Sequence, residues 1–256
     1  MKIFLSALEN AEASKGEGGQ SIAQLLINRG VRMQWNLMSF FYIRTQQNRA
    51  ELIRENTNEI LIDSGTHSFQ KGKKVDWERY TDEYAAFIRR FDRPNVIGYF
   101  EMDVDNVIGY DRVLSLRKRL EAVTDKIIPV WHKNRGVDDF KAMCQHYSGK
   151  IVAVTGFKNE DIKDDQYLMF LKYAREHGCK VHCLGMTRRK VLDKVPFDYA
   201  DSSTWVQSVL FGSIGGKKIT RDYSSKHRGE AMIHSYCNAI EMQRRYYKKW
   251  QCECHD

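Results

Sequence analysis

The feature that most constrains the fold is a repeated alternation between short apolar segments and segments with helical periodicity. Seven apolar segments are predicted as strands: residues 2–8, 59–63, 96–105, 127–132, 150–156, 179–184 and 197–200. Between them, apolar residues recur at helical spacing, as at Tyr84, Phe87, Ile88 and Phe91. Strands that alternate with helices over short connections form a parallel sheet, and this number of alternations favours a closed (β/α)8 TIM barrel.

Three segments carry weaker signals. Residues 31–43 are rich in aromatic side chains, and their secondary structure is ambiguous, whereas residues 217–223 are the best candidate for an eighth strand. Residues 9–20 are rich in Gly, Ser and Glu and are predicted to form a mobile loop before a helix capped by Ser21. Because no linker divides the chain, we expect one barrel domain over residues 1–256. Its C-terminal helix and tail, residues 228–256, are expected to pack on the barrel.

The composition argues against a membrane protein and favours a polyanionic partner. No run of eighteen residues is apolar, and the apolar N-terminus is too short for a secretory signal. The net charge is +8 and the sequence pI is about 9.1. Such an excess favours nucleic acid, although a basic enzyme without this partner stays open. The six cysteines are scattered, which indicates reduced thiols in a cytosol rather than a disulfide framework.

Polar residues and glycines stand where the predicted strands end. They are Asp63, Glu101 or Asp103, His132, Gly156, Gly185 and Asp201. In a (β/α)8 barrel these ends meet at the face that carries the active site. Burying an unpaired carboxylate is costly, so several acids at one face indicate a pair that divides the roles of nucleophile and general acid/base. For a single strand-end acid, the alternative is a helix cap or a pair with a lysine.

The segments around these residues resemble the tRNA-guanine transglycosylase superfamily, TIM barrels that exchange a guanine base for a 7-deazaguanine. Asp63-Ser64-Gly65 is similar to the family's DSGGF segment, and residues 100–103 to its FDE-type strand end. Residues 153–156 are similar to its LAVGE strand. Residues 184–201 are similar to its LxGVGTPxDLLxAVxxGxDxFD pattern. The resemblance covers about residues 59–205 in the family's order.

The resemblance implies roles for individual residues. Asp201 matches the nucleophile and Asp63 the general acid/base. Further residues would bind the base: Ser64, Gly65, Glu101 or Asp103, Trp131 or His132 in place of the family's VQGG segment, and Gly156 and Gly185 through their backbones. His67, Phe69 or Trp131 would stack on the base. No cofactor is expected.

The chain also departs from the family. Thr66 replaces the second glycine of DSGGF, and Ser-Ser-Thr-Trp at 202–205 replaces the PTR segment that follows the nucleophile. The family's zinc subdomain is missing, and we expect a protein without metal. The alternative is a structural zinc, for which Cys252, Cys254 and His255 are weak candidate ligands. The compact chain most resembles the phage and bacterial DNA-guanine transglycosylases. This resemblance favours DNA over tRNA as the substrate and a 7-deazaguanine such as preQ0 as the incoming base. It also implies that the protein works in the cytoplasm of a bacterium or phage-infected host cell.

Several alternatives stay open. A group of basic residues is predicted to contact phosphates, although each could be a solvated surface charge: Arg188, Arg189, Lys217, Lys218 and Arg221. His132 and His182 are interpreted as core histidines in preference to metal ligands. The competing functions are a tRNA-guanine transglycosylase, a base-releasing N-glycosylase that uses water, and a non-catalytic nucleic-acid-binding barrel. Homodimer formation is also left open.

Overall fold

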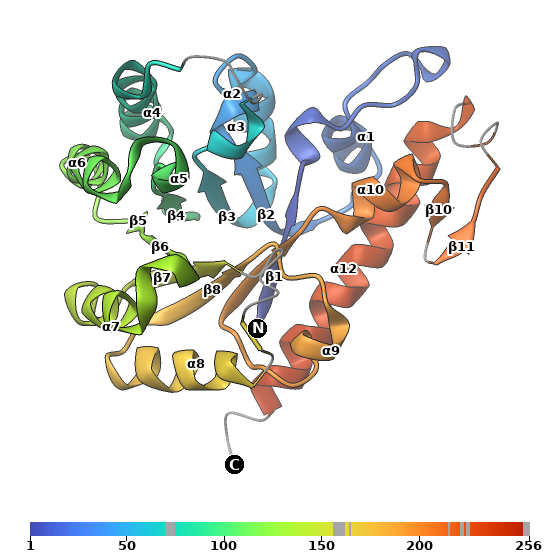
Figure 1. Cartoon of the computed structure of the whole chain (residues 1–256). Helices are drawn as coiled ribbons and strands as arrows, with labels where there is room; N and C mark the ends of the chain where they lie inside the picture. The colour runs from blue at the N-terminus through green and yellow to red at the C-terminus, as the bar shows by residue number, and fades with distance from the viewer. Residues whose placement is uncertain are drawn as a thin grey trace.

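The strands of this protein close into a parallel barrel. The computed structural model describes residues 1–69, 75–155, 162–163, 165–214, 216–220, 223 and 226–252. In these residues one sheet has the order β5-β4-β3-β2-β1-β9-β8-β7-β6 (Figure 1). Its strands are β1 (Lys2–Ser6), β2 (Met33–Ser39), β3 (Thr57–Asp63), β4 (Val96–Phe100), β5 (Ile127–Ile128), β6 (Val130–Trp131), β7 (Ile151–Thr155), β8 (Lys180–Leu184) and β9 (Tyr199–Ser202).

Pro129 explains why the sheet contains nine segments and not eight. It separates β5 from β6, and proline has no N–H to donate to a strand ladder. β5 pairs with β4 and β6 pairs with β7, so the two halves of one interrupted strand join the ends of the sheet. The barrel therefore closes with eight strand positions, and the predicted single (β/α)8 barrel is confirmed.

Helices surround the barrel. They are α1 (Ile22–Asn28), α2 (Phe40–Ile43), α3 (Gln47–Glu55), α4 (Trp77–Phe91), α5 (Asp105–Ile108), α6 (Tyr110–Glu121), α7 (Gly136–His146), α8 (Gln166–Glu176), α9 (Arg189–Leu192), α10 (Thr204–Leu210) and α12 (Arg228–Cys252). Ser21 caps α1 as predicted, accepting a hydrogen bond from the Gln24 N–H at 3.2 Å. Inside the barrel, Phe4, Leu61, Phe100 and Ile128 belong to a separate buried cluster.

The predicted eighth strand at residues 217–223 is wrong. Lys217–Lys218 forms β11, which pairs antiparallel with β10 (Ser213–Ile214) in a hairpin outside the barrel. The missing barrel strand is β2, inside the ambiguous segment 31–43. Five of its seven residues are buried, because a strand between barrel interior and helices is covered on both faces. Strand β2 also buries the polar Asn36, which bonds to Thr57 and Tyr236, so its sequence does not read as the apolar run of a buried strand.

The segment after β1 is also more ordered than a plain loop. It contains two 3₁₀ turns, η1 (Leu8–Asn10) and η2 (Lys15–Glu17), and Glu9 is buried. At the other end of the chain, α12 packs along β1 and β2. Its Gln243 donates hydrogen bonds to the carbonyls of Ile3 and Trp35 at 2.7 and 2.9 Å. Among the described residues, no helix combines the length and apolarity needed to cross a bilayer.

Candidate active site

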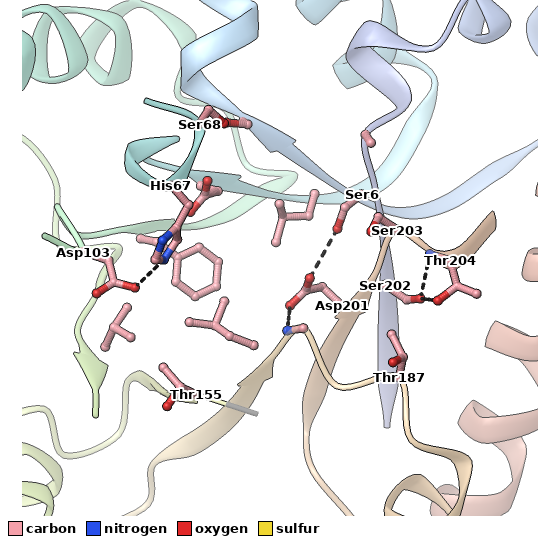
Figure 2. Close-up of a pocket in the computed structure, with 18 of the residues that line it drawn as sticks. Ser6, His67, Ser68, Asp103, Thr155, Thr187, Asp201, Ser202, Ser203 and Thr204 are labelled. Atoms are coloured by element: carbon pink, nitrogen blue, oxygen red, sulfur yellow. Dashed lines mark hydrogen bonds and ion pairs between the residues drawn. The ribbon is translucent and has the colours of Figure 1, made fainter. Parts of the chain in front are cut away.

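A cavity of about 690 Å³ opens where the barrel strands end (Figure 2). This volume lies in the range of roughly 300–1,000 Å³ that is typical of small-molecule sites. Nearly every strand contributes a residue at or just after its C-terminal end: Ser6, Ser39, Asp63, Phe100, Val130, Thr155, Leu184, Asp201 and Ser202. The cavity therefore occupies the face at which (β/α)8 barrels place their chemistry.

Asp201 lies on one wall of the cavity, near the end of β9. Its Oδ1 accepts hydrogen bonds from the Gly185 N–H at 2.8 Å and from His182 Nε2 at 2.9 Å. Its Oδ2 accepts a longer bond from Ser6 Oγ at 3.3 Å. Gly185 has a φ of 61°, a left-handed conformation that suits glycine, and this turn presents its N–H to the carboxylate. Oδ2 is consequently the oxygen that is less engaged with the protein.

His182 supports Asp201 from inside the barrel. Its side chain is fully buried between aromatic rings, with the centroids of Phe100 and Phe4 at 5.0 and 6.3 Å. Since Asp201 accepts from Nε2, that nitrogen carries a proton. Nδ1 has no hydrogen-bond partner among the described residues. His182 is thus a buried core histidine, as the sequence indicated, and it also positions the strand-end carboxylate.

Asp63 ends β3 and lies on a second wall of the same cavity, with β1 and β2 between it and β9. Burial raises its pKa from 3.8 to about 6, and the charges of Asp103 and Asp201 add to this effect. The Gly65 N–H donates to Oδ2 at 2.8 Å. Gly65 has a φ of 77°, and a Cβ there would lie 2.5 Å from the Cβ of Phe41. A larger residue at 65 would therefore displace the loop that holds Asp63.

Asp103 follows β4 and is clamped by two histidines. His132 Nε2 lies 2.5 Å from Oδ1, and His67 Nε2 lies 3.0 Å from Oδ2. Although burial opposes ionisation, these two hydrogen bonds hold the pKa of Asp103 well below its usual range. In turn, the bond with Asp103 raises the pKa of His67. Figure 2 shows His67 and Asp103 together on the side of the cavity away from Ser6 and Asp201.

Glu9 is a cavity residue that sequence reasoning missed. It lies in η1, only 2 % exposed, and its Oε1 accepts a hydrogen bond from the Ser39 N–H at 3.0 Å. Burial raises its pKa from 4.5 to about 7, with a contribution from the charge of Asp63. Glu9 Oε2 and Ser39 Oγ have no hydrogen-bond partner within the described part of the chain. These two atoms are thus buried, unsatisfied polar groups in this wall of the cavity.

Five predicted base-binding residues do not line the cavity. Glu101 is buried in a two-bonded ion pair with Arg117, at 2.5 and 3.0 Å, and accepts a bond from the Val130 N–H beside Pro129. It therefore holds the interrupted strand, and Asp103 is the acid of this pair that faces the site. The other four also have partners within the protein. Trp131 packs on Phe140 and Phe170, Phe69 packs on Phe41, Trp77 and Tyr80, Ser64 is fully buried, and Gly65 donates its N–H to Asp63.

The remaining predicted residues fall into two groups. Arg188, Arg189, Lys217 and Lys218 are exposed, the first two directly after the cavity residue Thr187 and the other two on β11. Gly156, Arg221, Cys254 and His255 lie outside the described residues, and α12 is described as far as Cys252. The zinc alternative at the C-terminal tail therefore stays a prediction.

One group in the described chain has the spacing of a metal site. The ligand atoms of Asp103, Asp105 and His132 lie within 4.8 Å of one another. However, Asp103 already accepts bonds from two histidines, and Asp105 pairs with Arg135 at 3.3 Å. A guanidinium in this position compensates the carboxylate and repels a cation. We therefore interpret this group as an ion-pair network.

No family model, curated protein or solved structure matches this chain. Asp201 accepts hydrogen bonds from Ser6, His182 and Gly185 and presents one lightly engaged oxygen, whereas burial raises the pKa of Asp63 to about 6. Such a difference between two carboxyl groups in one cavity suits a nucleophile and a general acid/base.

Proposed function

We propose that this protein is a guanine transglycosylase that replaces a guanine base in nucleic acid, DNA in preference to tRNA, with a 7-deazaguanine. The observation that carries the proposal is the presence of Asp63 and Asp201 on separate walls of one cavity, in different environments. The resemblance of the segments around both residues supplies the identity of the substrate. Such an enzyme would work in the cytoplasm of a bacterium or phage-infected host.

In the first half-reaction, Asp201 Oδ2 attacks the anomeric carbon C1′ of the target nucleotide. The bond from C1′ to the guanine nitrogen breaks, and the base leaves with the bonding electrons. Protonated Asp63 gives its proton to the departing base, for which a pKa near 6 is suitable. Gly185 and His182 keep Oδ1 in place, so Asp201 meets the sugar in a fixed orientation.

In the second half-reaction, the incoming base displaces Asp201 from C1′. Asp63 now accepts the proton that the incoming nitrogen loses, so acid and base roles alternate on one residue. The covalent glycosyl-aspartate divides one difficult displacement into two easier steps. Asp103, Glu9 and Ser39 supply polar groups for the base, and the rings of Tyr42, His67 and Phe100 border the same cavity.

The test measures the release of radiolabelled guanine from DNA and from tRNA in the presence of unlabelled base. We expect wild-type protein to exchange label from DNA and Asp201→Asn to exchange none. Exchange from tRNA alone would support the transglycosylase reaction but would make tRNA, and not DNA, the substrate. Abasic sites formed without exchange would indicate an N-glycosylase. Tight binding of nucleic acid without either product would indicate a non-catalytic nucleic-acid-binding barrel.

A further inference from the structure

One face of α10 leads from the cavity to the surface of the protein. Thr204 and Gln207 line the cavity, while Trp205, Val206 and Val209 are buried. The N–H of Phe211 donates to the Gln207 carbonyl at 2.9 Å, so the helical turn continues to Phe211. Residues three and four apart lie on one face of a helix, which places Phe211 on the same side as the two cavity residues. At 1.5 Å per residue, Phe211 lies about 10 Å along the axis from Thr204.

Phe211 is a large apolar side chain in solvent. Its exposure is 83 %, the highest among the exposed large hydrophobic residues of the described chain, and the adjacent Leu210 is 58 % exposed. Single exposed apolar residues are ordinary on protein surfaces. Two features distinguish Phe211 from such residues: it lies on the same helix as two cavity residues, and positively charged residues follow it in the chain.

A basic hairpin begins immediately after Phe211. The Ile219 N–H donates to the Gly212 carbonyl at 2.8 Å, and Lys217 and Lys218 pair with Ile214 and Ser213 across the hairpin. Both lysines are exposed, and residues 202–221 include no acidic residue. Figure 1 shows β10 and β11 at the edge of the molecule, beyond α10 and α12. An exposed ring next to positive charge is complementary to the stacked bases and phosphates of a duplex.

We propose that Phe211 is a wedge that enters the base stack of duplex DNA while the target nucleotide occupies the cavity, and that Lys217 and Lys218 bind the adjacent phosphates. This inference rests on the proposed function and extends it, because it commits the substrate to a base-paired strand. A nucleotide in a duplex must leave the stack before Asp201 can reach C1′. Apolar side chains that enter base steps offset this unstacking, which costs a few kcal/mol.

The experiment uses short DNA duplexes with one central G·C pair in varied flanking sequences, and the same guanine strands unpaired. We compare wild type, Phe211→Ala and Phe211→Trp. The control is Met169→Ala, which removes an exposed apolar side chain from α8. We expect Phe211→Ala to lower guanine exchange from the duplex about 10- to 100-fold and to leave exchange from the single strand unchanged. Phe211→Trp and Met169→Ala should retain exchange from both.

Binding supplies a readout that does not need turnover. A 2-aminopurine beside the central guanine should brighten when wild type unstacks it, and Phe211→Ala should abolish this rise. Replacing Lys217 and Lys218 with alanine should reduce the slope of log affinity against log salt by about 0.9 for each phosphate that the variant no longer neutralises.

The outcomes separate the wedge from the proposed function. If wild type exchanges guanine from single strands and Phe211→Ala matches it on the duplex, the wedge is overturned and the transglycosylase stands. Exchange from tRNA but not from duplex DNA would also overturn the wedge. If no nucleic acid exchanges, the proposed function fails, and the 2-aminopurine signal decides the wedge by itself.

Discussion

Two walls of one cavity hold carboxyl groups in contrasting ways. On the β9 wall (Ser6, His182, Gly185 and Asp201), one carboxylate accepts hydrogen bonds from Ser6 at the end of β1, from His182 in β8 and from Gly185 directly after β8. On the β3 wall (Glu9, Ser39, Asp63, His67, Asp103 and His132), three carboxyl groups share one region, and burial and mutual repulsion raise the pKa of two of them.

The contrast shows how the same side-chain chemistry is adapted to different tasks. A carboxylate with several hydrogen-bond donors is held in one orientation, which a nucleophile requires. A carboxyl group in a crowded, water-poor wall keeps a proton to higher pH, which an acid/base requires. The β9 wall is therefore suited to bond formation at C1′ and the β3 wall to proton transfer and base binding.

The largest effect is expected from the β9 wall. Asp201→Asn removes the nucleophile while keeping an isosteric side chain, and we expect exchange to fall by roughly 10⁴-fold or more. The measurement is single-turnover release of labelled guanine. Asp198→Asn, which changes a carboxylate at the other end of β9, is the matched control. If Asp201→Asn retained more than a tenth of the wild-type rate, the division between the two walls would not stand.

Asp63→Asn tests the β3 wall and should cost about 10²- to 10⁴-fold, the usual contribution of general acid–base catalysis. Because the pKa of Asp63 is raised to about 6, its proton is lost as the pH rises through that value. Guanine release by wild type should accordingly fall above about pH 6. The variant should lose this limb of the pH profile. An unchanged limb would assign the proton to another group, with Glu9 the first candidate.

Glu9→Gln should change stability with pH. The pKa of Glu9 is raised from 4.5 to about 7, so between these values the folded protein keeps a proton that the unfolded chain has released. Wild-type stability from this group therefore falls as pH rises from about 4.5 to about 7. The variant cannot ionise and should be more stable than wild type by up to about 3 kcal/mol at pH 8.

Urea unfolding at pH 5 and pH 8 measures this difference, with the exposed Glu51→Gln as control. A stability difference between Glu9→Gln and wild type that stays constant across this range would contradict a buried, protonated Glu9.

The smallest effect concerns the exposed end of the β3 wall. His67 is 76 % exposed, and its pair with Asp103 should contribute less than about 1 kcal/mol to stability because solvent screens it. Asp103→Asn should nevertheless lower the pKa of His67, since the bond with Asp103 is what raises it. An NMR titration of the histidine ring protons measures this change. The same titration in Asp138→Asn, on the surface of α7, should match wild type.

The barrel and its two principal acids could be predicted from the sequence because both follow from local patterns. Apolar segments recur between helical ones, and Asp63 and Asp201 stand at the ends of two of them. Strand β2 could not be recognised, because it buries the polar Asn36, whose hydrogen-bond partners Thr57 and Tyr236 lie on other elements. Residues 217–218 also form a strand, but they pair with β10 in a short hairpin outside the barrel, and the sequence does not show which partner they take.

The finer assignment of site residues depends on contacts that the sequence does not display. In the sequence, Glu101 and Asp103 are equivalent acids at a strand end. The structure distinguishes them, because Arg117 on a later helix pairs with Glu101. Trp131 has an aromatic ring that could stack on a base, but this ring packs on Phe140 and Phe170 of the surrounding helices. Glu9 reaches the cavity because a 3₁₀ turn folds it against the N–H of Ser39 on the neighbouring strand.

The most direct test of the division between the walls is to locate the covalent bond to the sugar. Wild-type protein is incubated with a guanine-containing DNA strand without incoming base, denatured, digested and mapped by mass spectrometry. We expect a deoxyribosyl ester on Asp201 and none in Asp201→Asn. An ester on Asp63 or Glu9, or base exchange with no adduct on any carboxylate, would contradict it.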